Sequence, residues 1–173
     1  MTEANDRPEQ EALLDALTAV SRLMVLVAAR CYAAIDTDVT MPHYRVLMKL
    51  ASHGPQRTVD IARELCVVPS AATRIIDRLV DRRLVRRLRR ADDRRTVYVG
   101  LAPAGQDLVA EVLFERRQRF AELVQSSGLH ASDETIAFLL GLVVAAGMTP
   151  DPQWWKPREE PTTGAGPMWQ ESS

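Results

Sequence analysis

The chain has 173 residues, of which 46% are hydrophobic and 26% are charged, and its formal net charge is −1. This length and composition are typical of a soluble globular protein with one domain, or with two small sub-domains that share a core. We expect neither a membrane span nor a signal peptide, because no apolar run is long enough and the first ten residues are polar. Cys31 and Cys66 have neither disulfide-framework nor zinc-site spacing, which favours a cytoplasmic protein.

Positive charge is concentrated in one segment. Residues 69–98 contain ten of the twenty arginines and four aspartates, a net charge of +6, so the rest of the chain carries −7. A basic block in an otherwise acidic protein suggests a face that meets a polyanion, and arginine suits both phosphates and guanine edges. The alternative is a solvated surface held by short-range ion pairs.

The first four predicted helices follow from apolar periodicity and from residues that begin or end helices. Apolar residues at steps of three or four predict a long helix over residues 9–35. Thr40 is the expected N-cap of a second helix, which stops before Gly54. Thr58 is the expected cap of a third helix, and Pro69 opens a fourth.

The pattern then changes to two short strands, residues 84–88 and 96–101, around a charged tip over residues 89–95. Such a pattern predicts a β-hairpin. A long helix is expected from Pro103 to about residue 125, and a last helix over residues 132–147 is almost entirely apolar. A surface helix of a monomer would not be so apolar, so we expect a subunit interface there.

Residues 148–173 differ in composition from the rest of the chain. They hold half of the ten prolines and all three tryptophans, Trp154, Trp155 and Trp169. This composition is typical of an irregular tail. Three alternatives remain open for it: docking on its own dimer, disorder, or binding to a specific partner.

Residues 40–101 therefore have the order helix, helix, turn, helix, strand, basic tip, strand, which is the plan of a winged helix-turn-helix. In such a module the second helix of the pair lies in the major groove, and the hairpin tip reaches the neighbouring minor groove. The candidates for base contact are the exposed residues at the start of the fourth helix: Ser70, Ala71, Thr73 and Arg74. Arg78 is placed to touch phosphate, and Arg94 and Arg95 lie at the wing tip.

The sequence resembles the MarR family of bacterial transcriptional regulators over roughly residues 10–147. The matching stretches are TMPHYRVLMKLASHGP, TVDIARELCVVPSAATRIIDRLVDRRLVRR and DDRRTVYVGLAPAGQDL. The resemblance implies a mainly α fold with a small β-wing: a winged helix-turn-helix over residues 40–101 within an all-helical dimerisation region, 9–35 and 102–147. It also implies a homodimer in which Arg95 enters the minor groove and Asp93 orients it.

The chain departs from the family pattern at five positions. Many members have glycine where this chain has Cys66 and Arg83, and such sites often need a positive φ, which costs other residues about 1 kcal/mol. Val68 and Ala102 stand where a capping side chain is usual, and Ala71 removes a hydroxyl from the reading face. These changes affect the expected docking geometry and base preference, but not the fold.

The resemblance further implies a ligand pocket between the dimer helices and the winged helix. Tyr32, His43 and Tyr44 are the candidate ligand-binding residues, and the alternative is that all three are ordinary core or boundary residues. Thiol sensing is a second hypothesis, although Cys31 does not match the position used by thiol-sensing relatives. We expect no metal site, because the three histidines have no paired spacing.

These observations predict a sequence-specific DNA-binding regulator, a repressor that acts as a homodimer on a pseudo-palindromic operator and responds to a small-molecule effector. Two alternatives stay open: a dimeric protein-interaction adaptor that uses a winged helix, and a thiol-based redox sensor. We expect no enzyme activity and no cofactor, since the sequence contains no nucleophile–base pairing, phosphate loop or metal set. The adjacent acids Asp92 and Asp93 lie among arginines, which suits ion pairing.

Overall fold

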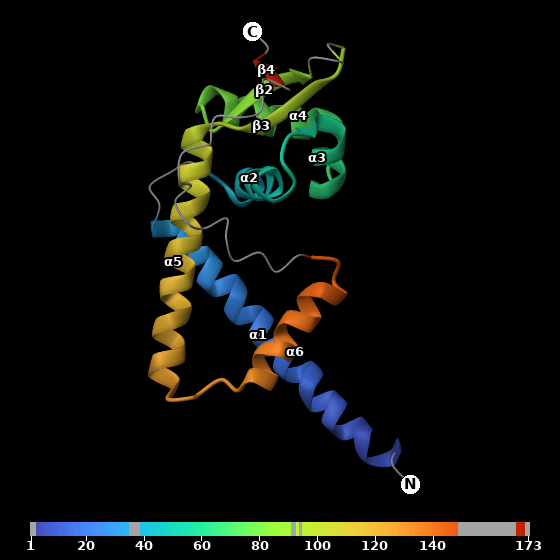
Figure 1. Cartoon of the computed structure of the whole chain (residues 1–173), viewed down its shortest axis with the longest axis vertical. Helices are drawn as coiled ribbons and strands as arrows, with labels where there is room; N and C mark the ends of the chain where they lie inside the picture. The colour runs from blue at the N-terminus through green and yellow to red at the C-terminus, as the bar shows by residue number, and fades with distance from the viewer. Residues whose placement is uncertain (1–2, 35–38, 91–92, 94, 149–168, 172–173) are drawn as a thin grey trace.

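The computed structural model describes residues 3–34, 39–90, 93, 95–148 and 169–171. The fold is mainly α with a small antiparallel sheet, as predicted (Figure 1). The helices are α1 (Glu3–Ala34), α2 (Met41–His53), α3 (Thr58–Leu65), α4 (Pro69–Asp81), α5 (Pro103–Ser127) and α6 (Asp133–Ala145). The strands are β1 (Gln56–Arg57), β2 (Val85–Arg90), β3 (Val97–Leu101) and β4 (Trp169–Glu171).

The sheet has the strand order β1-β3-β2-β4. The predicted hairpin is confirmed, with Val85 opposite Leu101 and Arg89 opposite Val97. Neither outer strand was expected: β1 pairs with β3, and β4 adds the last described residues of the chain to the free edge of β2. Part of the segment expected to be an irregular tail is therefore strand.

The winged helix-turn-helix has its own hydrophobic core. Gly105 brings the start of α5 against the sheet, since a Cβ at this position would lie 2.0 Å from the Leu84 carbonyl oxygen. The first turn of α5 is thus fixed against the beginning of β2. The buried core residues come from α2, α3, α4, both hairpin strands and α5: Val46, Leu47, Leu50, Ile61, Leu65, Ile76, Leu79, Val85, Val99, Leu108 and Val109.

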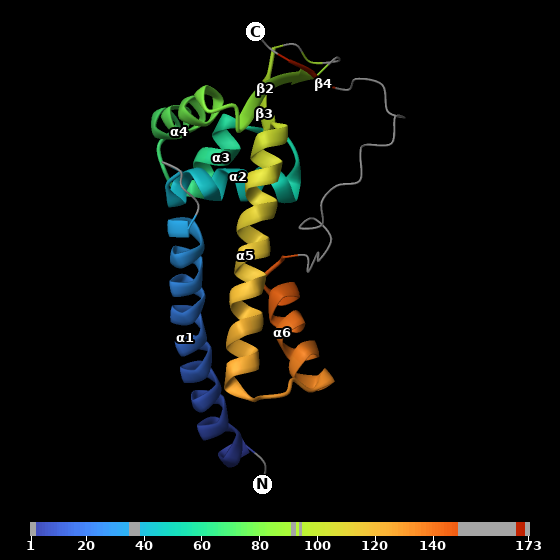
Figure 2. The same cartoon turned by 90° about the vertical axis from the view of Figure 1, so that its left-hand side faces the viewer.

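The long helices extend away from this module. A second buried cluster of Val27, Cys31, Tyr44 and Val112 joins α1 and α5 to α2. Figure 2 shows α1 and α6 on opposite sides of α5. No residue of α6 is buried, although the helix is almost entirely apolar. The apolar side chains of α6 are therefore left partly exposed in the single chain, and the subunit interface expected there stays a prediction.

Helix α1 differs from the expectation that the chain has no apolar run long enough to cross a membrane. The stretch Pro8–Cys31 is long and apolar enough, by length and composition, to cross a membrane. Most of this stretch is exposed in the single chain, and it contains five charged residues: Glu9, Glu11, Asp15, Arg22 and Arg30. A helix that packs on a second subunit has the same apolar composition.

The helix ends agree closely with the sequence expectations except at the starts of α1 and α3, and α1 begins at Glu3 instead of residue 9. Thr40 is the N-cap of α2, and its backbone N–H donates to Nδ1 of His43 over 3.1 Å. The expectation that Thr58 caps α3 is wrong, because α3 begins at Thr58 and Arg57 is its N-cap. Cys66 and Arg83 have positive φ values of 56° and 59°, as their glycine-like positions predicted.

Candidate nucleic-acid interface

One face of α4 is polar and exposed. Burial of Ala72, Ile76 and Leu79 against the core fixes the rotation of this helix. Four of the predicted groove-facing residues are exposed on the other side, namely Ser70, Thr73, Arg74 and Arg78, while Ala71 is half-buried. The Thr73 hydroxyl donates to the Pro69 carbonyl oxygen over 3.0 Å, so its oxygen remains an acceptor toward an approaching ligand.

The start of α4 lacks a capping side chain, as its sequence predicted. Val68 is the N-cap and makes no side-chain hydrogen bond, while the N–H of Ala71 donates to the Val68 carbonyl oxygen over 3.0 Å. The positive end of the helix dipole is therefore not occupied by a capping oxygen of Val68. Such a helix start favours an anion such as phosphate.

An ion pair ties α4 to the wing. Asp77 lies one turn beyond Arg74 on α4, and its Oδ1 accepts a hydrogen bond from Nη2 of Arg87 on β2. An unpaired carboxylate on this face would repel phosphate. The Arg87 guanidinium neutralises this carboxylate and links α4 to β2, two elements whose relative orientation is set by the packed core.

The wing tip is shaped by Asp93. Its Oδ1 accepts the backbone N–H of Arg95 over 3.0 Å and that of Thr96 over 3.2 Å. Hydrogen bonds from the Thr96 side chain and from the backbone of Arg95 lower the pKa of Asp93. In this geometry Asp93 orients the backbone that carries Arg95, whose side chain is exposed. Arg94, the other predicted tip residue, lies outside the described residues.

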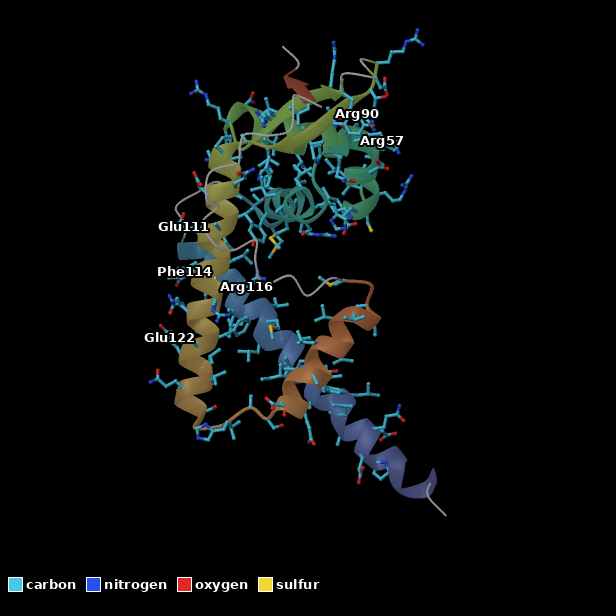
Figure 3. The ribbon with its side chains drawn as sticks, viewed as in Figure 1. Arg57, Arg90, Glu111, Phe114, Arg116 and Glu122 are labelled. Carbon is cyan, nitrogen blue, oxygen red and sulfur yellow. The ribbon has the colours of Figure 1, made fainter. Side chains whose placement is uncertain are left out.

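Other arginines, which are not among the predicted DNA-contact residues, lie at the sheet end of the molecule. Figure 3 shows Arg57 and Arg90 there, far from the Phe114 and Glu122 side chains on α5. Arg57 reaches this end because β1 pairs with β3, where Arg57 lies opposite Tyr98. Its Nε donates to Asp60 over 2.7 Å, and this hydrogen bond lowers the pKa of Asp60. A two-residue strand has no sequence signal strong enough to predict this placement.

The three candidate ligand-binding residues have different surroundings. His43 and Tyr44 are both buried, whereas the side chain of Tyr32 lies outside the described part of the structure. Nδ1 of His43 is engaged with Thr40 at the start of α2. A surface concavity of about 460 Å³ lies elsewhere, lined by Arg82 and Leu84 together with four residues of α5: Ala104, Asp107, Leu108 and Glu111.

The two cysteines occupy opposite environments. Burial raises the pKa of the Cys31 thiol, and the nearby Arg116 only partly offsets this effect. A raised pKa disfavours the thiolate that redox sensing requires. Cys66 is exposed at the end of α3. Among the described residues, no group of three His, Cys, Asp or Glu side chains could hold a metal ion.

The core of α2 to α4, the exposed polar helix face and the adjoining basic hairpin define a winged helix-turn-helix protein. The MarR family model matches residues 39–97. RV1404 from Mycobacterium tuberculosis is 33% identical in sequence, and its crystal structure superposes with a TM-score of 0.71 over 83% of this chain and 97% of that one. The chain belongs to the MarR family.

Curated relatives carry regulator names. The chain is 30% identical to the HTH-type transcriptional regulator FarR of Neisseria gonorrhoeae over 93 residues, 54% of this chain and 64% of FarR. It is 35% identical to the HTH-type transcriptional repressor MdtR of Bacillus subtilis over 79 residues, 46% of this chain and 51% of MdtR. The matches thus span between half and two thirds of these relatives. Their names describe a transcriptional regulator and a transcriptional repressor, the class of protein that the sequence predicts.

Proposed function

We propose that the chain is a homodimeric, sequence-specific DNA-binding transcriptional regulator. The observation that carries this proposal is the exposed polar face of α4 beside the basic β2–β3 hairpin. Ser70, Thr73 and Arg74 meet base edges in the major groove, and Arg78 meets a phosphate. Arg95 enters the adjacent minor groove, where an inserted arginine is attracted by the enhanced negative potential.

The dimer is formed by the long helices. Residues 9–35 and 102–147 make up the dimerisation region, and residues 40–101 make up the DNA-binding region. The proposal is supported by the exposed apolar side chains of α1 and α6, among them Leu26, Phe138 and Leu139, which are 42–49% exposed in the single chain. A two-fold dimer matches a pseudo-palindromic operator with half-sites about 10 base pairs apart.

The regulator acts as a repressor released by a small-molecule effector. The name of MdtR supports repression, and the family resemblance supports an effector. The effector site lies near the buried cluster that joins α1, α2 and α5, where His43 and Tyr44 provide polar groups among apolar side chains. Such a pocket couples directly to the operator, because α2 belongs to the DNA-binding region and α1 and α5 to the dimerisation region.

Selection of binding sites from a random duplex pool tests this function. The wild type is compared with Arg74→Ala and with Arg119→Ala, a control on α5 whose side chain pairs with Glu115. The wild type and Arg119→Ala are expected to enrich the same palindrome, and Arg74→Ala to lose preference at one position in each half-site. Absence of any enriched sequence with the wild type would overturn the proposed function.

A further inference from the structure

The C-terminal strand β4 extends the wing at the place where the wing must meet DNA. β4 pairs antiparallel with β2, with Arg90 opposite Trp169, Arg89 opposite Gln170, and Leu88 opposite Glu171. These three β2 residues form the half of the strand that adjoins the tip. Figures 1 and 2 both show β4 beside β2 at the end of the molecule farthest from the start of α1.

The hydrogen-bonding pattern of the hairpin explains why β2 accepts another strand. Ala102 N–H donates to the Leu84 carbonyl oxygen over 3.0 Å, which makes Leu84 and Ala102 a hydrogen-bonded pair. Because such pairs alternate along an antiparallel ladder, the even-numbered residues of β2 bond to β3. The backbone N–H and C=O of Arg89 therefore point toward the opposite edge, where Gln170 lies. An edge strand with open backbone groups is a template for a further strand.

Strand β4 is poorly matched to a DNA-bound wing. Neighbouring strands lie about 4.8 Å apart, and the minor groove is only about 6 Å wide. A third strand beside Arg90 therefore occupies the edge of the wing along which the DNA backbone must pass when Arg95 enters the groove. Charge acts in the same direction, because residues 149–173 carry a net charge of −2 while residues 69–98 carry +6. The acidic segment and DNA are both negatively charged, so both are attracted electrostatically to the basic wing and compete for it.

We propose that the C-terminal strand is an internal competitor of DNA: residues 169–171 dock on the tip-proximal edge of β2 and must leave before the wing enters the minor groove. This inference rests on the proposed DNA-binding function and adds a regulatory element to it. The fraction of molecules with β4 released sets the apparent operator affinity. Any partner that captures the C-terminal segment raises that fraction.

The test uses two full-length variants at the same position. Gln170→Pro removes the backbone N–H opposite Arg89 and prevents pairing, whereas Gln170→Ala keeps the N–H and serves as the control. Two quantities are measured: hydrogen exchange of the Arg89 amide without DNA, and affinity for the duplex selected by the wild type. We expect faster Arg89 exchange and about 5- to 10-fold tighter binding for Gln170→Pro, if 10–20% of wild-type molecules have β4 released. Gln170→Ala is expected to match the wild type in both measurements.

Two outcomes overturn the inference, and they are distinct from failure of the proposed function. An unprotected Arg89 amide in the wild type would show that β4 does not dock in solution. Protected Arg89 in the wild type, with Gln170→Pro exchanging faster but binding the duplex no tighter, would show docking without competition. If neither the wild type nor the variants bind any duplex, the proposed function fails and the inference fails with it.

Discussion

Asp77 of α4 and Arg87 of β2 form an ion pair that joins the two elements of the candidate DNA interface. The two side chains are 47% and 41% exposed, so water screens their attraction. The pair therefore contributes little to the stability of the fold. Its consequence is electrostatic, because it neutralises an acid on the face that the proposed function brings against phosphates.

A double-mutant cycle measures the strength of this pair. Asp77→Ala, Arg87→Ala and the double variant are expected to give a coupling of about 0.2–1 kcal/mol in the free energy of unfolding by urea. The coupling should fall at 1 M salt, where charges are screened over about 3 Å. A coupling that is unchanged at 1 M salt would mean that the contact is not electrostatic.

Arg95 is expected to supply the minor-groove contact. Arg95→Ala should weaken binding to an AT-rich operator by about 1–3 kcal/mol, because the narrow minor groove attracts an inserted arginine. Fluorescence anisotropy with labelled duplex measures the change, and Arg119→Ala removes the same charge from α5 as a control. Equal losses in the two variants would indicate a general charge effect instead of a groove contact.

Asp93 is expected to hold the wing tip as a carboxylate. Its pKa is lowered in the folded chain by the hydrogen bonds from Thr96 and Arg95. A lowered pKa contributes stability that is present above the ordinary aspartate pKa of about 3.9 and is lost as pH falls through the lower folded value. The amide chemical shifts of Arg95 and Thr96 should therefore titrate with a midpoint below the free-aspartate pKa of about 3.9. A midpoint at or above that value would contradict the turn geometry.

The left-handed conformation of Cys66 gives a prediction for stability. Cys66 has a φ of 56° and is exposed, so a glycine there relieves backbone strain with little loss of buried surface. Cys66→Gly is expected to raise the free energy of unfolding by up to about 1 kcal/mol, since the relief exceeds the added entropy of the unfolded chain. Cys66→Ala keeps the strain and should give no gain. A destabilised glycine variant would contradict this account of the turn.

The apolar surface of α6 is expected to be a dimer interface. Leu139 is 49% exposed in the single chain, and Leu139→Glu would place a charge in the apolar contact. Light scattering at micromolar concentration should show a dimer for the wild type and a shift toward monomer for this variant. Val59→Glu makes the matched change at an apolar side chain on α3 that is 45% exposed and lies outside the dimerisation region, and it should leave the dimer intact. A monomeric wild type would remove the basis for a palindromic operator.

The sequence predicted the elements whose signals are local. Apolar periodicity and cap residues identified the six helices, whereas the positive φ values of Cys66 and Arg83 were predicted by the family resemblance, in which glycine is common at these positions. The cap of α3 was misplaced by one residue because Thr58 is a good capping type, yet Arg57 is held in β1 by β3. The predicted helix start at residue 9 was also late, since α1 begins at Glu3 and runs through Pro8.

Contacts between distant residues were not predictable in the same way. The β4 strand has three residues and follows a proline-rich segment, so its composition resembles that of an irregular tail. The Asp77–Arg87 pair depends on the angle between α4 and β2, which the packed core determines. The exposed face of α4 was predictable, because the buried positions Ala72, Ile76 and Leu79 recur at helical spacing. The DNA-contact roles of its residues stay predictions.

The most direct test of the account compares operator binding with binding to a scrambled duplex of equal length across salt concentrations. The account predicts at least about 1,000-fold tighter binding to the operator. It also predicts a steep decrease in affinity with increasing salt for both duplexes, since arginines displace counterions from phosphates. Equal affinities for the operator and the scrambled duplex would contradict sequence-specific recognition by α4 and the wing.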